Sequence, residues 1–274
     1  MFMEQKFSVL FYINEKSTPA WLKRSIESVL SNTICPTEII AVVFGKISQE
    51  AQQIIDEAKA RTNFRVFSYS IGYGRAAALQ IAFSKCSNEL VALQDVDSIS
   101  LPTRFEAQLA YFSKHPETAV LGSWCQEMDN DSLLPIAVCE VPEKEEEIKV
   151  VLKRSAPFIC RTVMLKKSVA EDVGGYKTFP IFENEYLWTR ILGKGYKTAN
   201  LTSPLVQARA YGYPEVRAWS YFRMKKELFY EMRLMGVINR FTYYCKVCNC
   251  FIRYMLLANG LSNLFHHERL IADQ

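Results

Sequence analysis

Apolar runs and helical spacing alternate along the first half of the chain. Four strand-like runs lie at residues 7–13, 38–44, 64–69 and 89–94, and the first is a continuous apolar run, as expected of a strand buried on both faces of a sheet. Apolar residues at helical spacing follow each run or lie between runs, at residues 19–30, 49–61, 74–85 and 103–114. This alternation predicts an α/β fold with a mostly parallel central sheet flanked by helices. Ligands bind beyond the carboxyl ends of the strands in such sheets.

The pattern is less regular in the second half. We expect strands at residues 119–126, 134–141 and 162–165, and helices at residues 142–153 and 183–192. Residues 213–264 are almost entirely helical in pattern, with breaks near Gly236 and at Asn259-Gly260. We therefore predict one α/β domain over residues 1–212. A C-terminal helical extension over residues 213–274 follows it.

Composition narrows the class of protein. The chain has 274 residues, of which 49% are hydrophobic, enough to form a core and to exclude a disordered chain. A net charge of +4, with no recognised nucleic-acid module, argues against nucleic-acid binding. The N-terminus lacks a signal-peptide pattern, and no apolar stretch reaches the roughly 18 residues of a membrane span. With eight scattered cysteines, we expect a cytoplasmic protein with reduced thiols.

Two carboxylates directly follow the fourth predicted strand. Asp95 and Asp97 lie one residue apart, where an apolar strand ends. In that position both can face one hard cation, Mg²⁺ or Mn²⁺, that bridges to phosphate oxygens. The alternative is a pair of acidic turn residues that cap the next helix.

The sequence around this pair resembles a known family. Residues 86–108 (CSNELVALQDVDSISLPTRFEAQ) are similar to the core motif of family 2 glycosyltransferases, in particular the bacterial enzymes of capsule and exopolysaccharide assembly. The resemblance extends over residues 7–230. Its further matches are Leu121-Gly122-Ser123, Glu140-Val141-Pro142, Thr162-Val163-Met164, Gly174-Gly175-Tyr176, Phe182-Glu183 and Leu187-Trp188.

The resemblance implies a fold and a reaction. The fold is the nucleotide-diphosphosugar transferase fold called GT-A. The reaction moves a sugar from a nucleotide sugar, here expected to be a UDP-sugar, to a hydroxyl of a surface-polysaccharide intermediate, and it usually inverts the anomeric centre. Such a transfer needs a divalent cation at the departing diphosphate, a carboxylate that accepts the acceptor's proton, and a pocket that aligns donor and acceptor.

The resemblance also assigns residues to the donor site. It makes Asp97 the direct ligand of Mn²⁺ or Mg²⁺ and places Asp95 at the ribose or in the metal's water shell. Arg75 lies where the family commonly has a basic residue near the nucleotide, although a solvated arginine at a helix start is the alternative. Tyr12 and Phe44, at the ends of the first two strands, complete the expected donor-binding set.

Several polar positions depart from the family pattern. Phe44 replaces an acidic residue that reads the uracil ring, and an aromatic ring could still stack on a base. Asn184 replaces the aspartate that serves as catalytic base, and an amide cannot accept a proton at neutral pH. Glu183 is the preferred substitute, with Glu185 second. Ser98 stands where the family often has Asp, and Cys160-Arg161 where it often has His-Pro. Because of these departures, the alternative function is that of a degenerate domain, which acts as a binding or assembly partner.

The C-terminal quarter has its own chemistry. Residues 207–274 carry ten Lys/Arg and five Asp/Glu, interleaved with aromatic residues. A basic, aromatic helix pair can lie on the inner face of a cell membrane and meet a lipid-linked acceptor there, or it can simply pack on the domain.

A cysteine cluster in the same quarter allows a second, weaker interpretation. Cys245, Cys248 and Cys250, with His266 and His267 downstream, suggest either a zinc site or buried thiols.

Overall fold

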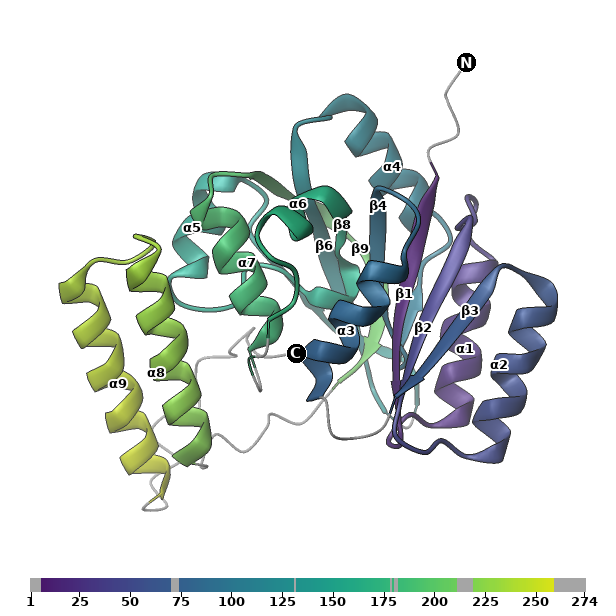
Figure 1. The fold of residues 1–274 in the computed structure, drawn as a ribbon, viewed down its shortest axis with the longest axis horizontal. Helices are drawn as coiled ribbons and strands as arrows, with labels where there is room; N and C mark the ends of the chain where they lie inside the picture. Colours follow the sequence, from purple (N-terminus) through teal and green to yellow (C-terminus); the bar gives the residue numbers. More distant parts are fainter. Residues whose placement is uncertain are drawn as a thin grey trace.

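A computed structural model describes residues 6–69, 74–130, 132–177, 179, 182–210 and 219–258 of the chain. Figure 1 shows a central sheet with helices on both sides and a pair of helices, α8 and α9, at one end. The strands are β1 (Phe7–Asn14), β2 (Glu38–Phe44), β3 (Phe64–Tyr69), β4 (Leu90–Asp95), β5 (Ser98–Ser100), β6 (Thr118–Met128), β7 (Pro135–Cys139), β8 (Met164–Lys166) and β9 (Lys197–Arg209). The helices are α1 (Pro19–Leu30), α2 (Gln49–Arg61), α3 (Gly74–Lys85), α4 (Arg104–Lys114), α5 (Glu145–Leu152), α6 (Lys167–Asp172), α7 (Glu183–Gly193), α8 (Trp219–Leu234) and α9 (Arg240–Ala258), with a 3-10 turn, η2, at Cys160–Thr162.

The strand order is β3-β2-β1-β4-β8-β6-β9-β5, with β7 paired to the side of β6. The four strands of the first half pair in parallel, as the sequence predicts. Strand β8 then runs antiparallel to both β4 and β6, while β9 is parallel to β6. The predicted α/β fold is confirmed, and the antiparallel strands of the second half make the complete sheet a mixed one.

Each face of the sheet has its own core. Strand β1 alternates between them: Val9 and Phe11 pack with α1, α2 and α4, whereas Leu10 packs with α3 and α7 on the opposite face. This alternation follows from the two-residue period of a strand. Helices cover both faces, so the central strands β1, β2 and β4 are mostly apolar, whereas the edge strand β3 contains Arg65 and Ser68.

Strand β9 is the main element that the sequence pattern did not indicate. It contains Pro204, which donates no backbone hydrogen bond, and the exposed Thr202 and Ser203, which interrupt its apolar residues. The strand forms because it pairs with β6 along nearly its whole length, with register shifts on either side of Trp124 that absorb the irregularity. Strand β5 and helix α6 are short additions that were also not predicted.

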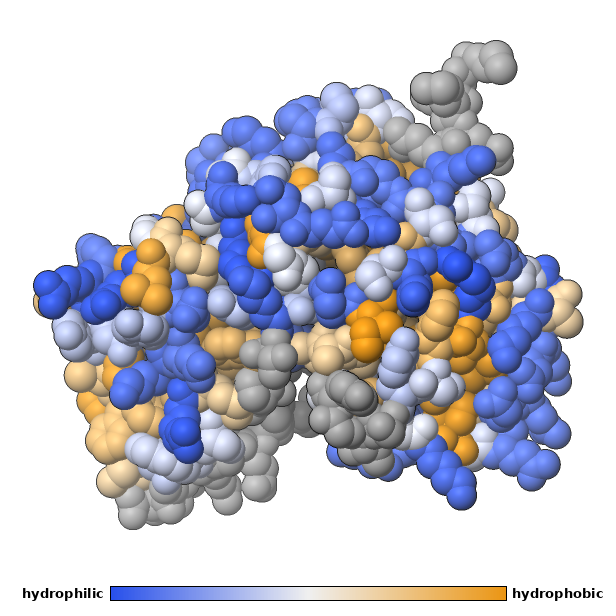
Figure 2. All heavy atoms as spheres, viewed as in Figure 1, coloured by the Kyte–Doolittle hydropathy of each residue, from blue (hydrophilic) through white to orange (hydrophobic). Residues whose placement is uncertain are grey.

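Helix α8 packs on helix α7. Its Leu228, Phe229 and Met232 belong to the same apolar core as α3 and α7, and the Tyr186 hydroxyl donates a hydrogen bond of 3.0 Å to Glu231. Figure 2 shows apolar and charged atoms side by side over the helix pair. Within the described residues no helix is both long and apolar enough to cross a membrane. The predicted boundary after residue 212 and the break at Asn259-Gly260 lie outside the described residues.

Candidate active site

The two aspartates lie at the carboxyl end of the parallel strands. Asp95 is the last residue of β4, and it lies opposite Tyr12 of β1 in the parallel ladder. Asp97 is in the turn that leads to β5. Their side chains remain 28% and 19% exposed, so both are accessible from solvent. The pair therefore occupies the edge of the sheet at which ligands bind in α/β folds.

A buried polar network holds the turn beneath the aspartates. Ser98 donates a hydrogen bond to the Asp95 carbonyl at 2.8 Å, and Gln94 donates to the Ser98 hydroxyl at 3.0 Å. Arg104 of α4 donates to Gln94 at 2.6 Å and to the Leu93 carbonyl at 2.8 Å. Burial lowers the pKa of Arg104 to about 9. Ser98, which stands where the family often has an acid, thus has a structural role here.

In the sequence, Arg104 is visible only as part of the motif at residues 86–108, which assigns it no role. The sequence feature that indicates a role for Arg104 is its spacing from Gln108. The two residues are four positions apart on α4, both are fully buried, and the Arg104 Nε donates to Gln108 Oε1 at 3.3 Å. Two polar residues on the buried face of an amphipathic helix indicate a hydrogen-bonded network.

Arg75 links the aspartates to helix α7. It lies in the first turn of α3, forms an ion pair with Glu183 and places Nη2 4.0 Å from Asp95 Oδ1. Its guanidinium also lies over the Tyr12 ring, 5.2 Å from the centroid. Burial alone would lower the pKa of Arg75, but the Glu183 and Asp95 carboxylates more than offset it, and the pKa rises. Arg75 is thus a partner of two carboxylates, with a side chain that stays 36% exposed.

A second guanidinium, that of Arg161, lies near the other carboxylate oxygen of Asp95 and also near Asp97. Its Nε lies 3.5 Å from Asp95 Oδ2, and its Nη1 lies 4.0 Å from Asp97 Oδ1. The residue is 3% exposed and belongs to η2. Burial lowers the pKa of Arg161, and the two aspartates reverse that effect and raise it. In the sequence, Arg161 stands out only as a departure from the family pattern, and that departure is the available signal.

The pKa of Asp97 reflects its burial and the charged groups around it. Burial raises the pKa of Asp97, the nearby Asp95 carboxylate raises it further, and Arg161 opposes both, which leaves the pKa above its ordinary value. Removal of solvent and proximity to a like charge both disfavour the ionised form. The pair therefore favours additional positive charge at this position.

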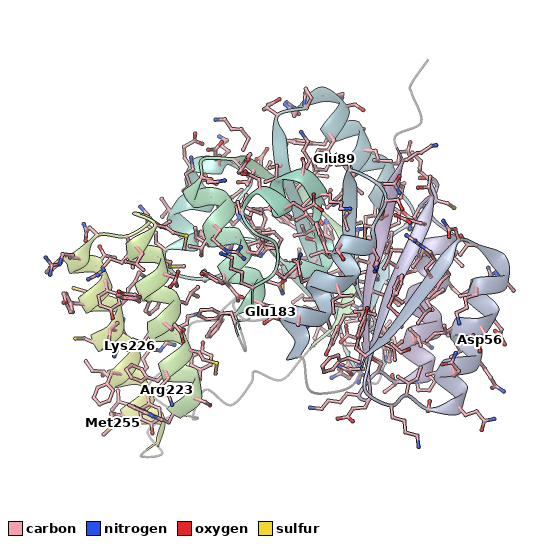
Figure 3. The ribbon with its side chains drawn as sticks, in the orientation of Figure 1. Asp56, Glu89, Glu183, Arg223, Lys226 and Met255 are labelled. Atoms are coloured by element: carbon pink, nitrogen blue, oxygen red, sulfur yellow. The ribbon has the colours of Figure 1, made fainter. Side chains whose placement is uncertain are left out.

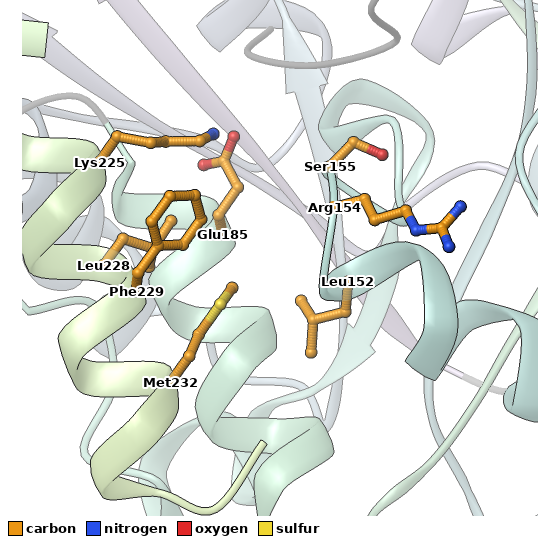
Figure 4. A pocket seen from close by; sticks show the side chains of 8 residues that line it. All are labelled: Leu152, Arg154, Ser155, Glu185, Lys225, Leu228, Phe229 and Met232. Atoms are coloured by element: carbon orange, nitrogen blue, oxygen red, sulfur yellow. The ribbon is translucent and has the colours of Figure 1, made fainter. Parts of the chain in front are cut away.

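The three candidate residues at the start of α7 are all buried. Glu183 is directed at Arg75, and through it at Asp95, and Figure 3 shows it between α7 and α3. Glu185 lines a separate pocket between α7 and α8. Figure 4 shows its carboxylate pointing toward the ammonium group of Lys225 there. The structure thus brings Glu183, but not Glu185, to the aspartates. Asn184 is buried between the two.

Phe44 ends strand β2 beside Tyr12. The two rings are tilted by 33°, with their centroids 6.3 Å apart. Phe44 is only 8% exposed and packs in the core, whereas Tyr12 is partly exposed below Arg75. The next residue, Gly45, has a φ of 83°, a conformation that favours glycine and ends the strand sharply.

The carboxylate pair suits a divalent cation that takes its other ligands from a substrate. Among the described residues, no group of three or more His, Cys, Asp or Glu side chains forms a metal cage. Mg²⁺ commonly binds through one or two carboxylates together with phosphate oxygens and water. Asp95 and Asp97 fit that requirement.

The buried-thiol interpretation of the C-terminal cysteines is wrong for two of the three. Cys245 and Cys248 are exposed on α9, and Cys250 is partly buried. Residues three apart share a face of a helix, so Cys245 and Cys248 lie on the same face of α9. Their exposure shows that this face is turned to solvent. His266 and His267, the other candidate zinc ligands, lie outside the described residues.

Known proteins resemble this chain over most of its length. The family model of glycosyl transferase family 2 matches residues 9–174. The UDP-Gal:alpha-D-GlcNAc-diphosphoundecaprenol beta-1,3-galactosyltransferase of Escherichia coli is 29% identical, over 86% of this chain and 90% of its own. The amylovoran biosynthesis glycosyltransferase AmsE of Erwinia amylovora is 28% identical, over 83% and 85%.

A solved structure supports the same fold. S. aureus TarS 1–349, solved in complex with UDP-GlcNAc, superposes with a TM-score of 0.67 at 12% identity, over 95% of this chain and 74% of that one. The chain spans 46% of the longer TarS structure. Because the family model covers more than half of the sequence, the chain belongs to glycosyl transferase family 2 and is a glycosyltransferase with the GT-A fold that its sequence led us to expect.

Proposed function

We propose that the protein transfers a sugar from a UDP-sugar to a hydroxyl of a lipid-linked surface-polysaccharide intermediate, with inversion at the anomeric carbon. The observation that carries the proposal is the group of charges at the carboxyl end of β4, where Asp95, Asp97, Arg75 and Glu183 converge. The names of the relatives support the substrates. One uses UDP-Gal and a diphosphoundecaprenol acceptor, and one belongs to amylovoran biosynthesis.

In this proposal, the aspartates hold the diphosphate end of the donor through a divalent cation. Asp97, with Asp95 beside it, would bind Mn²⁺ or Mg²⁺. Bound there, the ion would neutralise charge on the departing diphosphate. Arg75 would orient the donor, because its guanidinium lies between Asp95 and Glu183. Tyr12 would line the nucleoside pocket with its accessible ring, and Phe44 would support that ring from the core.

Glu183 is the proposed base. Its carboxylate is buried, lies at the end of α7 nearest the aspartates and is ion-paired with Arg75. A general base must lie within hydrogen-bond reach of the proton that it accepts. The acceptor hydroxyl would therefore enter between α7 and the aspartates. Glu185, which lines the separate pocket between α7 and α8, remains the second candidate.

The acceptor's lipid suggests where the reaction occurs. We propose that the α8–α9 pair rests on the inner, cytoplasmic face of the cell membrane as a peripheral contact. Exposed aromatic and aliphatic side chains on these helices lie beside exposed basic ones, and α9 contains no acidic residue. This composition favours an anionic membrane surface.

Calorimetric titration tests the donor site. We would titrate UDP and GDP into the full-length protein, each with and without Mn²⁺. We expect UDP to bind, and Mn²⁺ to strengthen that binding by about tenfold or more, equivalent to about 1.4 kcal/mol. Preference for GDP would overturn the uridine assignment. If neither nucleotide bound, the degenerate binding partner would become the better interpretation.

Two variants separate the site from the rest of the surface. Asp97→Ala should abolish the Mn²⁺-dependent part of UDP binding. Asp56→Ala removes a carboxylate from the exposed face of α2, far along the fold from the site, and should change nothing (Figure 3). UDP binding that keeps its Mn²⁺ dependence in Asp97→Ala would overturn the metal assignment.

A further inference from the structure

Arg161 is the site residue at which this chain adds a positive charge to the family pattern. The pattern often has a proline at that position, and this chain places a guanidinium between the two aspartates. The side chain is 3% exposed, so water screens its charge poorly. Its partners are the same carboxylates that the resemblance assigns to the metal.

We propose that Arg161 is a built-in counter-cation of the aspartate pair, which weakens the hold of the pair on a free divalent cation and makes metal binding depend on the nucleotide diphosphate. The proposal rests on the proposed donor site and adds an order of binding to it. Arg161 is thus a positioning residue that acts through Asp95 and Asp97.

The geometry supports competition between the guanidinium and a metal ion. Arg161 approaches Asp95 through Nε and Asp97 through Nη1, so one rigid, planar cation faces both carboxylates. Any divalent ion that bound both aspartates would lie close to this fixed positive charge. Repulsion between the two cations is strong where burial lowers the dielectric.

A nucleotide diphosphate changes this balance. It adds negative charge beside the guanidinium and offers oxygen ligands to the metal. Arg75, 4.0 Å from the other carboxylate oxygen of Asp95, adds a second positive charge beside the pair. The two guanidinium groups together should therefore let the site retain some affinity for the diphosphate before a metal ion arrives.

The test compares Arg161→Gln with the wild-type protein in two titrations. Glutamine keeps hydrogen-bond donors but removes the charge. Titration with Mn²⁺ alone should show binding that is tighter by about tenfold or more in Arg161→Gln. Titration with UDP in the absence of metal should show weaker binding in the same variant. Opposite changes in the two affinities distinguish a charge effect from structural damage, which would weaken both.

Further variants keep the test decisive. Arg161→Lys retains the charge and should bind Mn²⁺ as weakly as the wild type does. Arg61→Gln, on the exposed end of α2, removes an arginine that is also paired with a carboxylate and should leave both titrations unchanged. If Arg161→Gln does not fold, Arg161→Pro, which restores the residue of the family pattern, replaces it.

The outcomes separate this proposal from the donor assignment. Unchanged or weaker Mn²⁺ binding in a folded neutral variant would overturn the role of Arg161. A gain in Mn²⁺ affinity in Arg161→Lys equal to that in the neutral variant would also overturn this role. The same holds if Arg161→Gln and Arg161→Pro both fail to fold while Arg161→Lys folds. Tighter Mn²⁺ binding in a neutral variant, without UDP binding by any protein, would support the counter-cation and contradict the donor site.

Discussion

At the scale of single residues, the start of α7 contains two glutamates in different surroundings. Glu183 pairs with Arg75 beside the aspartates, whereas Glu185 lines the pocket with Lys225 and Arg154. We predict that Glu183→Gln lowers the rate of sugar transfer by about 10²–10⁴-fold, as loss of a general base does. Glu185→Gln, the matched control two residues away, should lose far less.

The measurement is single-turnover transfer from the UDP-sugar that binds, with thermal unfolding to establish that both variants fold. Donor affinity should change little in Glu183→Gln, since the proposed loss concerns the proton. A larger loss of rate in Glu185→Gln than in Glu183→Gln would show that the assignment of the base is wrong.

We expect Asp97 to lower the stability of the folded protein near neutral pH while it serves donor binding. The pKa of Asp97 is raised in the folded protein by burial and by Asp95. For a group whose folded pKa is raised, its contribution to stability is fully present below the unfolded pKa and is lost as the pH rises through the folded pKa. We therefore predict that Asp97→Asn is at least as stable as the wild type near pH 7, although it loses metal-dependent donor binding.

The pH dependence provides the check. The stability advantage of Asp97→Asn should shrink as the pH falls toward the ordinary aspartate value of 3.8, because the wild-type carboxyl then becomes neutral as well. Denaturant unfolding of both proteins at several pH values measures this difference. An advantage that grows on acidification would contradict the raised pKa.

At the scale of elements, the pairing of β6 with β9 depends on a close approach at Gly122. A Cβ atom at this position would lie 2.1 Å from Asn200 Oδ1 and 3.2 Å from the Phe158 ring. Asn200 is held by hydrogen bonds from its amide to the carbonyls of Pro142 and Pro157, at 2.7 and 3.1 Å. We predict that Gly122→Ala lowers the free energy of unfolding by about 1–3 kcal/mol.

Gly193 offers a matched control for this substitution. It lies at the end of α7, and a Cβ atom there would meet nothing closer than 3.5 Å. Gly193→Ala should leave stability unchanged or raise it by up to about 1 kcal/mol, because alanine favours the helix. Denaturant unfolding measures both variants. Equal effects at the two positions would show that the approach of Asn200 to Gly122 does not limit the sheet.

The elements also show how far sequence can predict this fold and this site. The strand-like runs predicted β1 to β4 within one or two residues. The mostly apolar β1, β2 and β4 were recognisable without their pairing partners because they are buried in the sheet. Strand β9 was not predicted because its stability comes from pairing with β6, and local residue spacing does not encode that pairing. The contact of Arg161 with the aspartates was not predicted for a related reason, since only the folded chain brings η2 beside the end of β4.

At the scale of the whole molecule, the helix pair forms a surface that differs from the rest of the fold. Trp219, Arg223, Lys226 and Tyr230 follow one another at helical spacing on the exposed side of α8. Helix α9 adds a row of exposed apolar side chains, with Phe241 the most exposed at 78%. Figure 3 shows Arg223 and Lys226 along α8 and Met255 near the end of α9. Aromatic, apolar and basic groups together favour the interface of an anionic bilayer.

This surface yields a prediction about vesicle binding. Full-length protein should cosediment with vesicles that contain anionic lipid and should be released by salt, because the attraction is partly electrostatic. Each basic residue near the surface contributes about 1 kcal/mol, so the double variant Arg223→Gln/Lys226→Gln should bind about tenfold to thirtyfold more weakly. Phe241→Ser should weaken binding at high salt as well, since it removes buried apolar area rather than charge.

The matched control is Lys59→Gln/Arg61→Gln, which removes two exposed basic residues from α2 at the opposite end of the sheet (Figure 1). It has the same net charge as the α8 double variant, so attraction by net charge alone would weaken both variants equally. If the α8 variant loses binding and the α2 variant keeps it, the helix pair is the membrane contact, at the end where we propose that a lipid-linked acceptor meets the protein. Equal losses, or no binding by the wild type, would assign the pair to packing on the domain alone.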